Sequence, residues 1–464
     1  MSTTREVDLV ADPIVPTLAR LTWPMIFGML GMVVYNITDT YFIGKLGVAQ
    51  LAAMGFTFPA VMFISSIVRG IGIGTASLFS RVIVAKNIST VQRYSVQIFI
   101  FALTLTVFFV GAGQLTIQPL FQLLGASSDV IPLIREYMVI WYWGIIFLVI
   151  PMVGNNMIRA TGKTFAPGMI MVFGSIMNLM FDSLLIFGWG PIPALGLQGA
   201  AVATVMSRAL TLVLSLYVLI YRERLLAISW SSLREMIHTW GKVLYVAGPA
   251  AMTILIVPLS IGFITRILAG FGPDAVAAFG VVSRLETFAL ILISALGSVL
   301  TVFAGQNWSA QQPVRLSKAL HVSALFSLGL GLFFFLIAQF FSTQIAAVFS
   351  SNTRVIRITA SYLQIVAFSY GLQGILRLSA SILNGINRPT ISFLLSLLRM
   401  VILYVPLAWI TSVLFGLQGI FWSAFAANIV AGSVAWYWLH RIITKRTDMG
   451  RSGQPLVVES ARSR

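Results

Sequence analysis

The sequence has no cysteine, only three histidines and few charged residues. Without cysteine it forms no disulfide, no thiolate metal site and no cysteine nucleophile. The histidines are too widely spaced to predict a zinc site. Acids are also scarce, since 13 aspartates and glutamates stand against 30 lysines and arginines. Each acid can therefore be considered individually.

The sequence is rich in hydrophobic residues. Of the 464 residues, 58% are hydrophobic and 9% charged, whereas a soluble domain is roughly half apolar and a quarter charged. The apolar residues fall in runs of about twenty, enough to cross a bilayer as a helix. Residues 1–16 lack the features of a cleavable signal peptide. The sequence predicts spans near 17–41, 52–79, 96–120, 131–158, 165–188, 196–221, 240–267, 276–304, 319–348, 355–383, 391–413 and 418–440.

The formal net charge of +17 is concentrated in the connectors between spans. Lysine and arginine are more frequent after even-numbered spans, so by the positive-inside rule both termini are cytoplasmic. Contact with anionic lipid explains this basic excess. We therefore expect the lipid bilayer as a partner, in the cell inner membrane, and no nucleic acid.

The two halves of the chain share short matches in the same order, as in transporters built from internal repeats. The matches pair Pro24 with Pro249, the GxxxxAAxG motif at Gly47 with that at Gly272, and the GLQG motif at Gly196 with that at Gly416. The predicted fold is an all-α integral membrane protein. Its twelve transmembrane helices form two six-helix lobes related by a pseudo-two-fold axis along the membrane normal.

The repeat predicts five regions along the chain. They are a cytoplasmic N-terminal segment at 1–16, an N-lobe at 17–221, a cytoplasmic linker at 222–239, a C-lobe at 240–440 and a basic cytoplasmic tail at 441–464. Within and just after the linker, residues 230–240 have apolar positions at helical spacing, which predicts an amphipathic helix lying on the membrane.

Two acids lie within the apolar runs of the first half. Asp39 follows Tyr35 and Asn36 by one helical turn, and Asp182 follows Asn178 by the same interval. Side chains at these spacings share a helical face. Acids within spans are rare and usually functional. The pair therefore predicts an ion-coupled membrane transporter.

The chemistry of this pair leaves two coupling ions open. Two neighbouring carboxyls titrate as a coupled pair and can take up a proton near physiological pH. The same oxygens of Asp39, Asn178 and Asp182, with the Thr204 hydroxyl, could instead ligate Na⁺. We expect no other cofactor or metal.

The second half has a weaker candidate. Glu286 lies inside the eighth span, two residues after Arg284, and residues at that spacing do not share a helical face. These two residues are a possible C-lobe polar site or part of a structural ion pair. Arg377 in the tenth span has the same alternatives. Asn155 is ambiguous, because intramembrane amides also join helices.

Several of these residues together resemble the multidrug and toxic compound extrusion (MATE) family, and most closely its DNA-damage-inducible-F-type (DinF-type) prokaryotic branch. The resemblance covers about 17–440. It is carried by the six-plus-six repeat and by Pro24, Tyr35-x-x-x-Asp39, Asn155, Asn178-x-x-x-Asp182 and Ala203-Thr204.

The resemblance implies a V-shaped pair of lobes that expels organic cations and other amphipathic drugs in exchange for H⁺ or Na⁺. It implies a cation-linked network of Asp39, Asn178, Asp182 and Thr204, with Tyr35 and Asn155 hydrogen-bonded to it and Pro24 where the first span bends. Another branch has acids in spans seven and ten. Here those spans have none, which places the coupling site in the first lobe.

The predicted function is a monomeric, cation-coupled multidrug efflux antiporter. It exports small organic drugs and dyes by alternating access, driven by H⁺, with Na⁺ as the less favoured coupling ion. The alternative is a lipid-linked precursor flippase of the same superfamily, for which Arg284 and Arg377 offer positive charge. A passive channel is a further alternative. An enzyme is not expected, because no clustered nucleophile, acid–base pair or metal set is present.

Overall fold

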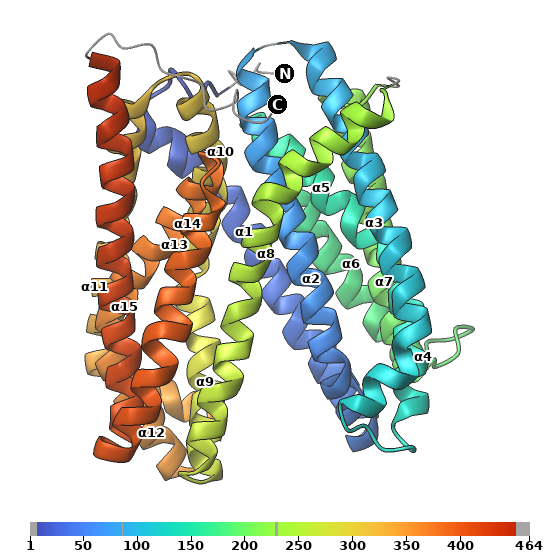
Figure 1. The fold of residues 1–464 in the computed structure, drawn as a ribbon. Coiled ribbons are helices and arrows are strands. Elements are labelled where there is room, and N and C mark those ends of the chain that lie inside the picture. Colours follow the sequence, from blue (N-terminus) through green and yellow to red (C-terminus); the bar gives the residue numbers. More distant parts are fainter. Residues whose placement is uncertain (1–6, 86, 228–230, 452–464) are drawn as a thin grey trace. The chain divides into compact units, whose positions relative to one another are not determined.

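The computed structural model describes residues 7–85, 87–227 and 231–451. Across these residues the chain is helical, and the extended pairing is limited to one isolated bridge between Trp189 and Ile192 (Figure 1). The elements are α1 (Ile14–Leu46), α2 (Val48–Val82), η1 (Ile83–Ala85), α3 (Ile88–Leu123), α4 (Ile131–Trp143), α5 (Ile146–Ala160), α6 (Phe165–Phe187), α7 (Gly196–Tyr217), η2 (Val218–Arg222), α8 (Leu233–Ala269), α9 (Pro273–Ala289), α10 (Ile291–Ser309), α11 (Pro313–Phe349), α12 (Thr353–Val366), η3 (Ala367–Ser369), α13 (Tyr370–Gly385), α14 (Pro389–Leu397), η4 (Leu398–Tyr404) and α15 (Val405–Arg451).

These elements account for the twelve predicted spans. In the described part of the chain, ten helical stretches are long and apolar enough to cross a membrane, and α4 and α5, bent by 42°, together form an eleventh span. The longest stretch contains a kink at Gly416, where φ is 62°. This kink divides the stretch into spans eleven and twelve. The prediction of an all-α fold with twelve spans is therefore confirmed.

Several helices are longer than the predicted spans. The first predicted span, 17–41, lies within Ile14–Leu46, and the ninth, 319–348, lies within Pro313–Phe349. Hydropathy marks only the residues that match the hydrocarbon core, whereas backbone hydrogen bonding continues into the polar flanks. Sequence therefore located the spans but underestimated their ends.

The chain folds as two compact units. The N-terminal unit is Ala19–Leu255, and the C-terminal unit combines the described residues up to Leu18 with those from Ile256 onward. The divisions fall inside α1, after Leu18, and inside α8, after Leu255, whereas the sequence placed a linker at 222–239. The first part of α8 belongs to the N-terminal unit because it packs there. The Trp240 indole donates a hydrogen bond to the Gln97 carbonyl at 2.9 Å.

The predicted amphipathic helix at 230–240 is not a separate element. From Leu233 the segment forms the first turns of α8, which continues to Ala269 without a break. Its Thr239 hydroxyl is buried and donates to Gln97 Oε1 at 2.6 Å. Contact with α3 therefore involves only the end of the segment, at Thr239 and Trp240. The apolar side chains of Leu233 and Ile237 remain exposed. Trp230, the first residue of the prediction, lies outside the described residues.

Matched glycines give the two halves the same backbone conformation at matched positions. Gly47 and Gly272, which precede α2 and α9, have φ of 140° and 100°. Gly196 and Gly416, the first residues of the repeated GLQG motif, have φ of 55° and 62°. Side chains disfavour these angles and glycine permits them. The short sequence matches therefore mark true structural equivalents.

The last glycine of each GLQG motif allows close helix packing. A Cβ at Gly199 would lie 2.3 Å from the Leu185 carbonyl oxygen, and one at Gly419 would lie 2.2 Å from the Thr411 carbonyl oxygen. Such contacts are typical of membrane helices, whose association depends on close approach of backbones. Each glycine thus fixes a helix against the end of the preceding span.

We predict that Gly199→Ala and Gly419→Ala each destabilise the protein by about 1–3 kcal/mol, the usual cost of overpacking. The clashing atom is a backbone carbonyl, which cannot rotate away. The measurement is the melting temperature of the purified protein in detergent, followed by tryptophan fluorescence. Gly329→Ala in α11 is the matched control, because a Cβ there meets nothing within 4 Å. Melting temperatures equal to wild type in both variants would contradict the prediction.

Candidate cation-coupling site

Glycines bring α1 and α6 into close contact. A Cβ at Gly168 would lie 2.5 Å from the Pro24 carbonyl oxygen, and one at Gly31 would lie 3.1 Å from Ser175 Oγ. Because small residues at both places let the helices approach closely, the faces of α1 and α6 that carry Gly31 and Ser175 face each other.

The register of this pair places Asp39 level with Asp182. The Thr164 hydroxyl, just before α6, donates to the Leu21 carbonyl in α1 at 2.7 Å. Asp39 follows Leu21 by 18 residues, and Asp182 follows Thr164 by 18 residues. Eighteen residues are five full helical turns, about 27 Å along the axis. The two acids therefore lie at one level on facing sides, and they are close enough to interact electrostatically.

The acids are buried, with oxygen atoms that have no protein partner. Asp182 is 0% exposed, Asn178 2% and Asp39 9%. Asp39 Oδ1, both carboxylate oxygens of Asp182 and both amide atoms of Asn178 are buried without a hydrogen bond. A buried unpaired polar atom is costly, and a buried unpaired charge more so. Such an arrangement fits groups whose partner is a proton or a cation.

Helix α7 completes the cluster. Thr204 is 1% exposed, and its hydroxyl lies 3.4 Å from the Tyr35 hydroxyl of α1, within hydrogen-bonding distance. Tyr35 is also close enough to interact electrostatically with Asp39 and Asp182. Four of the residues predicted from sequence therefore lie together with Tyr35: Asp39, Asn178, Asp182 and Thr204.

Two residues of this cluster were not predicted from the sequence. Arg208 of α7 interacts electrostatically with Asp39, and Tyr137 of α4 interacts with both acids. The Arg208 guanidinium lies 6.0 Å from the centre of the Trp141 ring, and its Nη1 is buried without a partner. The signal was present, because Arg208 follows Thr204 by one helical turn and Trp141 follows Tyr137 by the same spacing.

Three other predicted residues have different partners. The Asn36 amide donates to the Met32 carbonyl at 2.7 Å on an exposed face. Asn155 accepts a hydrogen bond from the Ser215 hydroxyl at 3.3 Å. Since Ser215 is eleven residues beyond Thr204 on α7, this contact lies about 16 Å further along the helix. Pro24 lies inside α1, where its carbonyl meets Gly168.

The C-lobe site predicted at Glu286 and Arg284 contains Glu286 but not Arg284. Glu286 accepts a hydrogen bond from the Gln373 amide, and its Oε1 lies 3.8 Å from Arg399 Nη2. Arg284 is exposed and is not a partner of Glu286. The spacing of two residues along the helix explains this separation, and Arg399 had no sequence signal that linked it to Glu286.

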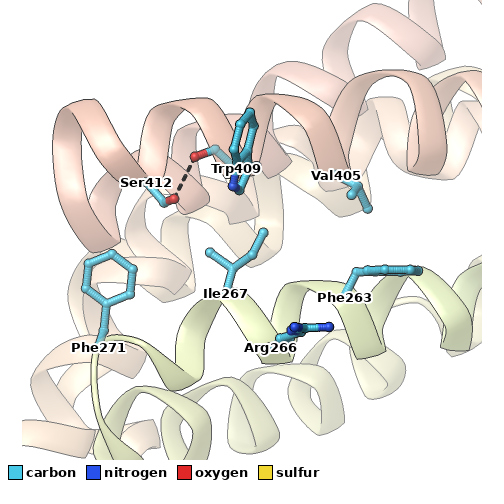
Figure 2. Close-up of a pocket in the computed structure, with 7 residues that line it drawn as sticks. All are labelled: Phe263, Arg266, Ile267, Phe271, Val405, Trp409 and Ser412. Carbon is cyan, nitrogen blue, oxygen red and sulfur yellow. Dashed lines mark hydrogen bonds between the residues drawn. The ribbon is translucent and has the colours of Figure 1, made fainter.

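A groove in the C-terminal unit, shown in Figure 2, offers no acid. Its lining is mainly apolar and aromatic, with one charged group, Arg266, and the Ser412 hydroxyl, which donates to the Trp409 carbonyl at 2.7 Å. Figure 2 shows the remaining lining side chains, Phe263, Ile267, Phe271 and Val405. None of the residues predicted for the coupling site lies in this groove.

The donor set of the N-terminal cluster suits hard cations. Carboxylates, an amide oxygen and a hydroxyl are all oxygen donors, which alkali and alkaline-earth cations prefer over nitrogen or sulfur. Among the described residues, no three or more His, Asp or Glu side chains are grouped as a transition-metal site. The set fits proton binding equally well.

A protein-family model matches this chain in two segments that correspond to the two halves of the internal repeat. The MatE family model matches residues 24–184 and 249–410, which is more than half of the chain. The two matched segments begin 225 residues apart, at the same prolines that mark the internal repeat. The family unit therefore occurs twice in this sequence.

Relatives match along nearly the whole chain. A FAD transporter of Shewanella oneidensis is 37% identical over 94% of this chain and 96% of its own length. A multidrug export protein of Staphylococcus saprophyticus, MepA, is 24% identical over 89% and 90%. Among solved structures, a mutant of the Vibrio cholerae MATE transporter VcmN is 30% identical over 93% of this chain and 97% of that chain, with a TM-score of 0.89.

The family match, the near-complete coverage of these transporters and the buried acids of the first unit agree with one another. The DinF-type branch stays a prediction. The chain belongs to the MATE family of multi-span membrane transporters.

Proposed function

We propose that this transporter is a cation-coupled antiporter of the cell inner membrane, with both termini cytoplasmic, that exports amphipathic organic compounds in exchange for H⁺. The observation that carries the proposal is the buried pair of Asp39 and Asp182, in which Asp39 Oδ1 and both carboxylate oxygens of Asp182 are buried without a hydrogen-bond partner. A proton on one carboxyl relieves the repulsion between the two. Na⁺ is the less favoured coupling ion.

The surrounding groups support coupling through this pair. Arg208 supplies one positive charge beside two acids, so the cluster keeps a net negative charge when both acids are ionised. An organic cation that approaches the cluster would be attracted by this charge. Protonation removes the attraction, so proton binding and cation binding compete. Competition at one site is sufficient for exchange, provided that the site is open to one side of the membrane at a time.

A second candidate substrate is a flavin dinucleotide. The Shewanella oneidensis relative named as a FAD transporter shares 37% identity with this chain, while the relative named MepA from Staphylococcus saprophyticus shares 24%. Substrate choice can change within a family without a change of fold, so this comparison favours a flavin without excluding drugs.

We predict that an outward proton gradient drives dye uptake into proteoliposomes in the absence of Na⁺. Asp39→Asn and Asp182→Asn should each reduce this uptake to the level of protein-free liposomes, because an amide cannot exchange a proton. Asp129→Asn, which changes an exposed acid of the same unit, should transport like wild type. Transport that follows only a Na⁺ gradient would make the cluster a sodium site. Normal transport by both Asp39→Asn and Asp182→Asn would refute the assignment of the coupling site to this cluster.

For the second candidate, we predict that proteoliposomes loaded with FAD release it faster when an inward proton gradient is imposed, because protons then enter as the flavin leaves. Fluorescence of the external medium measures the release. A flavin substrate should also compete with dye transport by the same protein. If FAD is retained at the rate of protein-free liposomes while dye is transported, the chain is a drug exporter and not a flavin exporter.

A further inference from the structure

The C-terminal unit contains a second polar cluster that the coupling mechanism does not use. At its centre Arg399 of η4 pairs with Glu286 of α9 at 3.8 Å and donates from Nε to Asn428 Oδ1 at 2.7 Å. Asn428 in turn donates to the Ser369 hydroxyl at 2.8 Å. The Arg399 side chain is 13% exposed. It is therefore held in place by two elements and reaches the surface of the unit only in part.

A second guanidinium lies in the same cluster. Arg377 follows Gln373, the hydrogen-bond donor to Glu286, by one turn of α13, and it interacts electrostatically with both Glu286 and Arg399. The described contacts include no hydrogen bond or ion pair of the Arg377 side chain. Two cations thus share one carboxylate. The excess positive charge is costly within a membrane protein and favours a bound anion.

Unpaired hydroxyl groups surround these charges. The phenolic oxygens of Tyr370 and Tyr404 are buried without a hydrogen-bond partner, and both tyrosines interact electrostatically with Glu286. A phenol can donate a hydrogen bond to an anion. Gln373 Oε1 is also unpaired, which leaves an acceptor for a hydroxyl group of the same ligand.

We propose that this arginine–tyrosine cluster, consisting of Arg377, Arg399, Tyr370 and Tyr404, binds the phosphate or diphosphate group of an organic substrate. Guanidinium groups match phosphate oxygens in a bidentate manner, and charge-assisted hydrogen bonds of this kind are strong. Together with Glu286, the cluster has one more cation than anion, whereas the coupling cluster of the N-terminal unit has two acids and one arginine. The two units therefore offer sites of opposite charge.

The role of the cluster in transport rests on the proposed function, but its ligand binding does not. The test is therefore an equilibrium measurement without any ion gradient. The purified full-length chain in lipid nanodiscs is titrated with FAD, followed by quenching of flavin fluorescence, and FAD is then displaced with inorganic pyrophosphate. We expect saturable binding of FAD, displacement by pyrophosphate, and weaker binding of riboflavin, which has no phosphate.

Arg377→Gln is the discriminating variant, because it removes the excess charge and leaves the pair of Arg399 and Glu286 intact. We expect its dissociation constant for FAD to rise about tenfold or more, as for the loss of a charge-assisted hydrogen bond. Arg284→Gln removes an exposed arginine close to Glu286 and should bind like wild type. Tyr404→Phe, which removes one hydroxyl, provides a second test and should weaken binding by a few-fold.

The outcomes separate this inference from the proposed function. Equal FAD affinity in wild type, Arg377→Gln and Tyr404→Phe, or no displacement by pyrophosphate, would overturn the anion site even if dye transport is proton-driven. Asp39→Asn should lose transport and keep FAD binding. A polyprenyl diphosphate included in the nanodisc tests a lipid source of the same group. Displacement of FAD by this lipid would support the proposed phosphate site, as displacement by pyrophosphate would. It would also identify a membrane lipid as a ligand of that site.

Discussion

The contact between α1 and α6 is the constraint on which the coupling cluster depends. At Gly168 the helices approach so closely that a Cβ would lie 2.5 Å from a backbone carbonyl, and the bond from Thr164 to Leu21 fixes their relative position along the axis. Five turns further on, this register alone brings Asp39 level with Asp182. Packing of small side chains at one end of the helices thus positions charged side chains at the other.

The sequence predicted what is encoded within single helices. Spans were found from apolar runs, and the pairs of Tyr35 with Asp39 and Asn178 with Asp182 from one-turn spacing. Contacts between distant helices were not predictable in this way. Arg399 joins Glu286 across 113 residues of chain, and Arg284, two residues away on the same helix, does not. The segment from Leu233 has an amphipathic pattern, but it is continuous with α8, and its end contacts α3 through Thr239 and Trp240.

The two repeats have kept their backbone and exchanged their polar chemistry. The first glycines of the GxxxxAAxG and GLQG motifs have positive φ in both units, because the fold needs this conformation wherever the unit occurs. The buried polar residues are under no such requirement. One unit carries two acids with one arginine, and the other two arginines with one acid. An ancestral repeat can therefore supply one scaffold for two different ligands.

The division of α8 between the units has a mechanical consequence. The chain passes between the units inside two helices, α1 and α8. Any rotation of one unit against the other must therefore bend these helices rather than swing on a loop. Pro258 has no N–H to donate to the carbonyl of Ile254, and this missing bond falls at the boundary between Leu255 and Ile256. Pro249, nine residues earlier in α8, removes a second such bond. The two prolines therefore lower the bending stiffness of α8 over the stretch that leads to the junction.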